Sequence, residues 1–460
     1  MPILFENLNF LQKIIYKNKK VDRSYIMYID IDSPFLNFMF AIFHCHSSIS
    51  YLHCVNFCCK VYYHSTTRFF CFFFFPFNNH LFFFYYTYLT EKKKAMGISG
   101  LLMALSDCKK RKHIKEYADK TVGIDISCWL HKGVYSCSDK ICKGINTTRY
   151  VDYCIKNIKI LQRHHVTPLV VFDGGLLPAK AGTEKHRQEK RNMALKEAMA
   201  AEKRNDYRLA RQYYVRAVDV TPYMCRKLMD KLDEMAVTYV VAPYEADAQL
   251  AFLARTGQVD AVISEDSDLL TYGCRRVLYK WDRDSGIGDE IDEHYAMLNA
   301  KKLDMRHWTK DQFLTMCIFA GCDYLPSLKG VAITKAYHLV NKYKTYTRVL
   351  RQLRFEAKTI IPRDYKEGFE KAQLTFRHAL VWDPRKEKLV HLTPLKSIID
   401  PEKLEFLGPN IPRDLAREIC TGKIDPITRV DFIPDQIVIE NANFDTTTTK
   451  KFTSFTNCFR

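Results

Sequence analysis

Seven acidic residues in this chain mostly follow short apolar runs, although the chain as a whole carries a formal net charge of +18. Carboxylates that converge repel one another, and two unit charges about 4 Å apart at an effective dielectric near 20 cost roughly 4 kcal/mol. Divalent cations remove that cost, and all-oxygen ligands favour Mg²⁺ or Mn²⁺ over zinc. The seven residues are Asp125, Asp173, Glu245, Asp247, Asp266, Asp268 and Asp323.

Two ions spaced about 3.5 to 4 Å apart can activate a water molecule and stabilise the leaving oxygen of a phosphate ester. Any one of these acids alone is more typical of a surface or a turn, whereas the joint pattern favours a two-metal site that hydrolyses phosphodiesters. Because seven carboxylates carry more charge than two divalent ions neutralise, we expect some of them to hold metal-bound waters.

The apolar runs before these acids predict buried strands. Each run is short, and longer helical stretches separate the runs, which is typical of a parallel sheet with crossover helices. Ligands bind beyond the carboxyl ends of such strands, so acids far apart in sequence can converge there. Asp323 instead follows a helical run, residues 313–321. The predicted fold is therefore α/β, with a central, mostly parallel sheet flanked by helices. The runs are residues 122–124, 169–172, 237–242 and 261–263.

Residues 1–95 differ sharply from the remainder because they contain no glycine, where about 7% would be ordinary. Their most aromatic run, residues 69–89, is interrupted at 76–80, so neither half approaches the roughly 20 residues that span a membrane. We interpret residues 1–95 as an artefact of the gene model or an unfolded extension, with a membrane anchor as the alternative. Folding of the mature protein is expected to begin near Met96.

The remaining composition narrows the class of protein. A length of 460 residues allows two or three domains, and 47% hydrophobic residues can form a sizeable core. The 16 cysteines include no Cys-x-x-Cys pairs, so we expect reduced thiols rather than a zinc site, which favours the nucleus or cytosol. Residues 441–460 are polar and aperiodic, and we interpret them as a tail or a second gene-model error.

A basic stretch, residues 179–216, is rich in Ala, Glu, Lys and Arg and has no glycine or proline after Gly182, so it should be helical. Lys180 and Arg187 lie seven residues apart, two helical turns along one face. Such a pair could grip the phosphate beside the metals, and the other basic residues, including Arg191, could follow the DNA backbone. The alternative is an ordinary solvated helix face.

A second element, residues 324–340, directly follows Asp323. Pro326, Ser327 and Gly330 predict a tight turn between two helical stretches, and helix N-termini beside such a turn present N–H groups to phosphate. We expect this element to bind the backbone of duplex DNA without reading its sequence.

Several motifs together resemble the structure-specific 5′ nucleases of the flap endonuclease and XPG superfamily. They cover Met96 to about Pro401, with weaker similarity to about Asp425. The motifs APYEADAQLA, EDSDLL and VWDPRKEKL are most similar to the exonuclease 1 branch. The motifs that carry the resemblance are MGISGLL from Met96, GIDISCWLHKG from Gly123, VVFDGG from Val170, VAPYEADAQLA from Val241, ISEDSDLLTYGC from Ile263 and AGCDYLPSLKGV from Ala320.

The resemblance implies a PIN-like 5′ nuclease fold. Its parts would be an XPG-N-like region (96–194), a helical arch (179–216), an XPG-I-like region (225–322), a helix-two-turn-helix (323–345) and a C-terminal helical wrap (346–440).

The resemblance also implies roles for single residues. Lys180 and Arg187 would steer the scissile phosphate, and Ser327 and Val331 belong to the region that holds K⁺ against the duplex. One metal would be bound by Asp125, Asp173, Glu245 and Asp247, and the other by Asp266, Asp268 and Asp323. The implied DNA contacts are Gly97, Trp129, His131, Arg191, Ser327, Gly330, Val331 and Lys335.

The chain departs from the family at two positions. Ser127 stands where exonuclease 1 proteins commonly have a tyrosine, so stacking on the terminal base would be weaker or left to His131 and Trp129. Ala332 stands where a second glycine is common, which changes the cation geometry at the turn. The long tail that recruits mismatch-repair proteins in the family is almost missing after the core.

We therefore expect a nuclear, Mg²⁺-dependent 5′→3′ double-stranded DNA exonuclease with 5′-flap endonuclease activity, serving mismatch repair, recombination and end resection. Mn²⁺ could substitute for Mg²⁺. Its partners would be duplex DNA with 5′ ends, nicks, gaps or 5′ flaps, and no membrane. The alternatives are a dedicated flap endonuclease or junction resolvase of the same superfamily, and a non-catalytic DNA-binding member.

Overall fold

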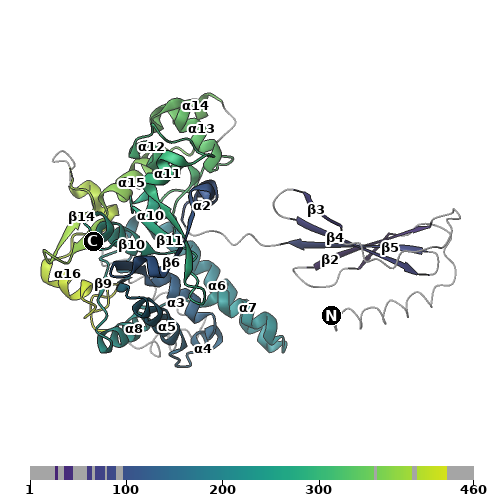
Figure 1. The fold of residues 1–460 in the computed structure, drawn as a ribbon, viewed down its shortest axis with the longest axis horizontal. Coiled ribbons are helices and arrows are strands. Elements are labelled where there is room, and N and C mark those ends of the chain that lie inside the picture. The colour runs from purple at the N-terminus through teal and green to yellow at the C-terminus, as the bar shows by residue number, and fades with distance from the viewer. Residues whose placement is uncertain are drawn as a thin grey trace, which may run out of the picture. The chain divides into compact units, whose positions relative to one another are not determined.

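The computed structural model describes residues 97–356, 360–395 and 401–432, together with the backbone of strands nearer the N-terminus. The chain divides into two compact units, residues 1–94 and 95–460 (Figure 1). The described strands of the first unit form an antiparallel sheet in the order β1-β2-β5-β4-β3. They are β1 (Ile26–Ile29), β2 (Leu36–His44), β3 (Lys60–His64), β4 (Arg68–Phe77) and β5 (His80–Leu89).

The aromatic run at 69–89 therefore supplies two neighbouring strands, β4 and β5, rather than a helix. In the described part of the chain, no helix is long and apolar enough to cross a bilayer. The interpretation of residues 1–95 as an artefact or extension stays a prediction, and Met96 itself lies outside the described residues, as do residues 433–460.

The described strands of the second unit form a seven-stranded sheet in the order β6-β12-β11-β10-β7-β8-β9. In the part of the sheet from β11 to β9, neighbouring strands are parallel. At the other edge, β12 is antiparallel to β11, and β6 is antiparallel to β12. The four strands predicted from the apolar runs, β7 to β10, are confirmed. The strands are β6 (Lys110–His113), β7 (Thr121–Asp125), β8 (Thr167–Phe172), β9 (Tyr239–Val241), β10 (Ala261–Ile263), β11 (Arg276–Tyr279) and β12 (Ile287–Asp292).

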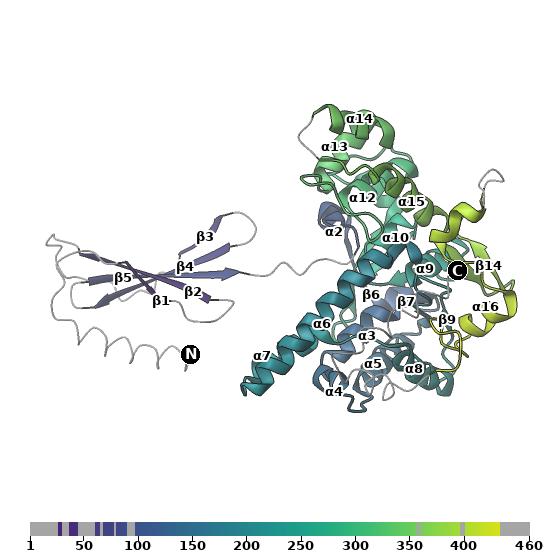
Figure 2. The ribbon, with the colours of Figure 1, turned by 180° about the vertical axis from the view of Figure 1, so that it is seen from behind.

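Helices cover both faces of this sheet, as Figures 1 and 2 show. Neighbouring residues of one strand serve opposite faces: Val170 belongs to the core beneath α3 (Ile126–Val134), α5 (Arg149–Arg163) and α8 (Pro222–Glu234). Val171 belongs to the core beneath α9 (Ala246–Arg255), α10 (Asp268–Thr271) and α12 (Lys310–Ala320). This alternation is what a strand buried on both sides requires. The predicted α/β fold is confirmed.

The remaining short elements connect or extend these layers. They are α2 (Leu101–Ala104), η1 (Ser106–Cys108), η2 (Ile114–Tyr117), α4 (Ser138–Cys142), η3 (Pro178–Lys180), α11 (Glu293–Asn299), α13 (Ile333–Tyr343), α14 (Tyr346–Phe355), α15 (Tyr365–His378), β13 (Leu380–Asp383), β14 (Lys388–His391), η4 (Pro401–Leu407) and α16 (Arg413–Cys420).

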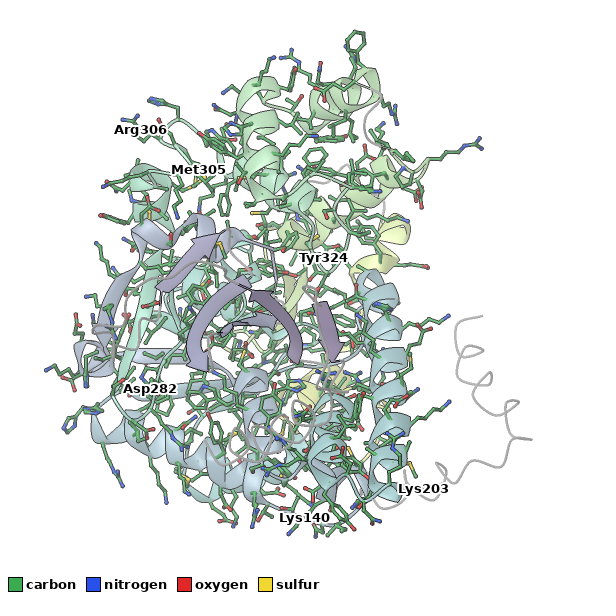
Figure 3. All side chains as sticks on the ribbon, turned by 90° about the vertical axis from the view of Figure 1, so that its right-hand side faces the viewer. Lys140, Lys203, Asp282, Met305, Arg306 and Tyr324 are labelled. Carbon is green, nitrogen blue, oxygen red and sulfur yellow. The ribbon has the colours of Figure 1, made fainter. Side chains whose placement is uncertain are left out.

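The basic stretch is helical, as predicted, and forms a hairpin of α6 (Ala181–Lys203) and α7 (Tyr207–Ala217). Small side chains allow the two helices to pack closely, because Ala198 and Ala201 of α6 meet Ala210 and Tyr214 of α7 in a core of their own. The end of α6 is tied to the body of the unit, where Lys143 pairs with Glu202 at 2.5 Å. Lys203 marks this end of α6 in Figure 3.

The predicted turn between two helices is also present. Helix α12 ends at Ala320, and Gly321 follows with φ 98°, a conformation that favours glycine. A Cβ at Gly321 would lie 2.9 Å from the Ser327 nitrogen, so the turn folds back on itself. Helix α13 begins at Ile333, and Asp323 lies on the connection between the two helices.

Candidate active site

The ends of the parallel strands place the acids as the sequence predicted. Asp125 is the last residue of β7, and Asp173 directly follows β8. Glu245 and Asp266 lie a few residues beyond β9 and β10. The other three acids lie in or just after helices: Asp247 lies in the first turn of α9, Asp268 begins α10, and Asp323 lies on the connection after α12.

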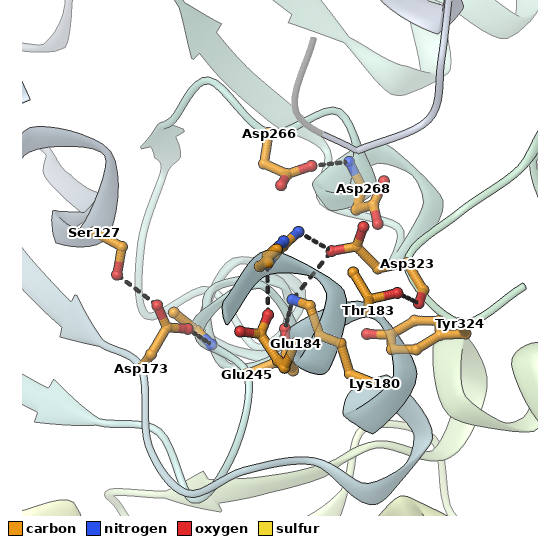
Figure 4. A network of polar contacts seen from close by, with 12 residues as sticks. Ser127, Asp173, Lys180, Thr183, Glu184, Glu245, Asp266, Asp268, Asp323 and Tyr324 are labelled. Atoms are coloured by element: carbon orange, nitrogen blue, oxygen red, sulfur yellow. Dashed lines mark hydrogen bonds and ion pairs between the residues drawn. The ribbon is translucent and has the colours of Figure 1, made fainter. Parts of the chain in front are cut away.

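Electrostatic interactions connect all seven acids into one cluster. Asp125 interacts with Asp173, and Asp173 with Glu245. Burial raises the pKa of Asp247 well above its ordinary value, and repulsion from Asp266 and Asp125 raises it further. Asp323 in turn interacts with Asp266, Asp268 and Glu245. Figure 4 shows Asp173, Glu245, Asp266, Asp268 and Asp323 near one another. The structure therefore brings together every acid that the sequence singled out.

Burial raises the pKa values of acids in this cluster. Burial raises the pKa of Asp266 to about 7, and it raises the pKa of Asp268 well above its ordinary range, with repulsion from Asp266 adding to it. Asp268 Oδ1 is buried and has no hydrogen-bond partner among the described residues. Because the donors are all carboxylate oxygens, this set fits a hard divalent cation, whose charge would lower these pKa values.

Lys180 and Arg187 lie directly against the acids. Lys180 Nζ is 2.6 Å from Glu245 Oε2 and 3.2 Å from Asp323 Oδ2, and Arg187 Nη2 is 2.8 Å from the same Asp323 oxygen. Burial alone would lower the pKa of Lys180, but attraction to Glu245 and Asp323 outweighs it and holds the pKa well above its ordinary value. The lysine is therefore a fixed positive charge inside the acidic cluster.

No three acidic, histidine or cysteine side chains within residues 97–356, 360–395 and 401–432 converge as tightly as the ligands of a single ion. The ammonium group of Lys180 takes the position between Glu245 and Asp323. The assignment of individual acids to two metals stays a prediction.

Hydrogen bonds orient two of the acids, and these partners were not predicted. Asp173 Oδ1 accepts from the Ala246 N–H at 2.9 Å, and its Oδ2 accepts from Ser127 Oγ at 2.5 Å (Figure 4). Asp125 Oδ2 accepts from Ser264 Oγ at 2.6 Å and from Cys128 Sγ at 2.9 Å. The signal for Ser264 was its place directly after β10, at the same sheet edge as Asp125.

Gly97 packs against the same cluster. Its φ is 72°, and a Cβ there would overlap Asp266 Oδ1 and Asp268 Oδ1. Gly97 therefore lies beside the acids, and its contact with DNA stays a prediction.

Two of the predicted DNA contacts have buried side chains. Trp129 is only 4% exposed and stacks on Trp281, with ring centroids 5.5 Å apart, so it cannot stack on a base. The Val331 side chain is 2% exposed and belongs to the core, which leaves only its backbone available to a ligand.

The other predicted contacts are accessible to different degrees. Ser327 and Gly330 are exposed, and His131 and Lys335 are half-buried. Arg191 pairs with Asp219 at 3.0 Å on the arch side. Gly330 and Lys335 line a shallow pocket together with His338 and Lys342 of α13, two basic residues that the sequence analysis did not single out.

Comparison with known proteins decides the family. The XPG N-terminal domain model matches residues 96–194 and the XPG I-region model matches residues 236–323, and all seven acids lie within these ranges. Exonuclease 1 of Arabidopsis thaliana is 40% identical over 357 residues, covering 78% of this chain and 48% of that protein. The DNA damage-inducible protein DIN7 of Saccharomyces cerevisiae is 30% identical, covering 68% of this chain and 72% of that protein. The chain belongs to the exonuclease 1 family.

The chain spans about half the length of the Arabidopsis exonuclease 1, 48% of it. Among solved structures, it is similar to the Holliday junction-resolving enzyme GEN1 in complex with product DNA, Mg²⁺ and Mn²⁺ ions. That likeness has 16% identity and a TM-score of 0.44, and it covers 70% of each chain.

Proposed function

We propose that this exonuclease 1 family member is a Mg²⁺-dependent 5′→3′ double-stranded DNA exonuclease that also cuts 5′ flaps. It would act in the nucleus, in mismatch repair, recombination and end resection. The observation that carries the proposal is the cluster of seven carboxylates around the fixed cation of Lys180, with Arg187 at its edge. Family membership supports the same activity.

The acids would hold two divalent ions, Mg²⁺ or Mn²⁺. Asp125, Asp173, Glu245 and Asp247 would bind one ion, and Asp266, Asp268 and Asp323 the other. Bound divalent ions supply charge neutralisation at a phosphodiester and a lower pKa for water. The buried, partnerless Asp268 Oδ1 and the raised pKa of Asp266 support cation binding at this cluster.

The residues of the chain itself would bind and orient the scissile phosphate. Lys180 and Arg187 share the carboxylate of Asp323 in the structure, and a phosphate could take over those charge-assisted hydrogen bonds. Both residues would then offset the negative charge that develops at the phosphate during hydrolysis. Because η3 and α6 carry them, the arch would fix where the phosphate stands relative to the acids.

The turn before α13 would bind the duplex away from the cut. Helix α13 begins without a side-chain cap, so its first N–H groups can face a phosphate, and Lys335, His338 and Lys342 line the adjoining pocket. We propose a DNA backbone contact here, with K⁺ held near Ser327. Such a surface carries no base code, so specificity would follow DNA shape.

A duplex with a recessed, labelled 5′ end tests the proposal. We expect the purified full-length chain with Mg²⁺ to release products one or two nucleotides long. Asp173→Ala should lower the rate by at least about a hundredfold, because it removes a ligand and leaves its hydrogen-bond partners unpaired. Asp304→Ala, which breaks an exposed ion pair with Arg306, is the matched control and should leave the rate unchanged.

Each other outcome has a definite meaning. Unchanged degradation by Asp173→Ala would refute the metal assignment. Silence on the recessed end combined with cutting of 5′ flaps would indicate a dedicated flap endonuclease. Binding of the duplex without any cleavage would indicate a non-catalytic DNA-binding member.

A further inference from the structure

A C-terminal segment, residues 404–432, packs beneath the loops that carry two of the acids. We call it the strap. Its helix α16 supplies Ala416, Ile419 and Cys420 to the same core as Phe172 and Tyr244, which stand next to Asp173 and Glu245 in the chain. The core contact therefore reaches the acidic site through the residues immediately before its ligands.

Tyr244 is the point where the strap meets the site. Its side chain is only 4% exposed, and its hydroxyl donates to the Pro409 carbonyl oxygen at 2.6 Å. The neighbouring strap residue, Gly408, has φ 97°, and a Cβ there would overlap the Tyr244 ring. The strap backbone thus lies against the hydroxyl end of the ring and accepts its hydrogen bond there.

The two ligand loops are bonded to each other at the same point. The Gly174 N–H donates to the Tyr244 carbonyl oxygen at 2.7 Å, and the Gly175 N–H donates to the Pro243 carbonyl oxygen at 3.0 Å. The Ala246 N–H donates to Asp173 Oδ1 at 2.9 Å. A shift of Tyr244 would therefore move the Glu245 turn and the Asp173 loop together.

The strap also faces the Asp173 loop directly. A Cβ on Gly175 would lie 3.1 Å from the Pro426 carbonyl oxygen, so the strap backbone closes over this glycine. Another contact anchors the strap between these points, because Arg226 Nη1 donates to the Gly422 carbonyl oxygen at 2.6 Å. These contacts hold the strap at Pro409, Gly422 and Pro426.

We infer that the strap positions Asp173 and Glu245 for divalent cations, and that Tyr244 is the positioning residue through which it acts. The inference rests on the proposed function, because that proposal assigns both carboxylates to a metal. Tyr244 touches neither ion nor substrate in this account. Its hydroxyl fixes the backbone between the two ligands, as outer partners of metal ligands do.

Tyr244→Phe in the full-length chain tests the role, because it removes the bond to Pro409 and keeps the ring packing. The control is Tyr346→Phe, which removes a hydroxyl bond of 2.7 Å to Glu370 in a different part of the fold. The readout is Mn²⁺ affinity measured by titration calorimetry without DNA. We expect Tyr244→Phe to weaken Mn²⁺ binding by about tenfold and Tyr346→Phe to leave it unchanged.

Nuclease kinetics provide the second readout. With Tyr244→Phe, kcat should return to the wild-type value as Mg²⁺ is raised, while KM for the duplex stays constant. If Tyr244 had only a structural role, Tyr244→Phe would lower the melting temperature of the protein and leave the dependence of kcat on Mg²⁺ unchanged. Gly408→Ala places a methyl group against the Tyr244 ring, so it should also weaken Mn²⁺ binding. Circular dichroism verifies that this variant is folded.

The outcomes separate this inference from the proposed function. Equal Mn²⁺ affinity of Tyr244→Phe and Tyr346→Phe, with normal metal binding by the wild type, would overturn the strap's role alone. Wild-type protein that binds no Mn²⁺, together with an active Asp173→Ala variant, would overturn both.

Discussion

Asp266 shows what burial does to a single residue of the site. Its pKa of about 7 means that the folded protein holds a proton there at a pH where the unfolded chain, with an ordinary value near 3.8, has lost it. The folded state therefore binds more protons than the unfolded state between about pH 4 and pH 7. Its contribution to stability is fully present at low pH and is lost as the pH rises through this window.

The prediction is measured on metal-free protein in a chelator. The free energy of unfolding of the wild type, relative to Asp266→Asn, should fall between pH 4 and pH 7 with a slope of up to about 1.4 kcal/mol per pH unit. Urea unfolding of both proteins across that range gives the difference. A difference that stays flat with pH would contradict the raised pKa, and added Mg²⁺ should flatten it in the wild type.

Residues also mark the limit of what sequence patterns predict. Four of the acids were predictable because they lie at or just beyond the ends of strands whose apolar runs are local in sequence. The burial of Trp129 was not predicted, because its partner Trp281 lies more than 150 residues away. The bond from Ser264 to Asp125 and the bond from Tyr244 to Pro409 span similar separations. No local periodicity reports such pairs, because they arise when separate elements pack.

At the scale of elements, the arch depends on the alanine seam between α6 and α7. A larger side chain at Ala198, which is fully buried there, must push the helices apart at a cost of about 1 to 3 kcal/mol. The helix pattern of this hairpin was predictable from its composition. Its seam was not, because small residues on a charged helix give no strong periodic signal.

Ala198→Leu should therefore lower kcat on duplex DNA severalfold while leaving Mn²⁺ affinity unchanged. It disturbs the arch, which positions Lys180 and Arg187, and none of the acids. Ala200→Leu, on the same helix but outside the seam, is the control. Calorimetry and single-turnover cleavage give the two quantities. Loss of metal affinity in Ala198→Leu would show that the arch and the acids are one unit.

At the scale of the whole molecule, the second compact unit contains both cores, the sheet and every acid of the site. The sheet and its helices followed from the apolar runs, whereas the strands of the first unit were not predicted. An aromatic run can form either a helix or a strand, because an unbroken apolar run has no hydrophobic periodicity that would distinguish the two.

Protein produced from Met96 should match the full-length chain in melting temperature and in cleavage rate per molecule, because residues 95–460 bury their own cores. Thermal melting and the labelled-duplex assay measure this. Higher activity and solubility of the full-length protein would show that residues 1–95 serve the enzyme.

The hairpin of α6 and α7 connects two distant points of the second unit. Its longer helix has 23 residues, which at 1.5 Å per residue is about 35 Å of rod. One end carries Lys180 and Arg187 among the acids, and the other is fastened at Glu202 to Lys143. A continuous helix passes a displacement of one of its ends on to the other end. A mutation or a ligand at the Lys143–Glu202 ion pair would therefore displace Lys180 and Arg187 at the other end of α6, without any contact to the acidic site.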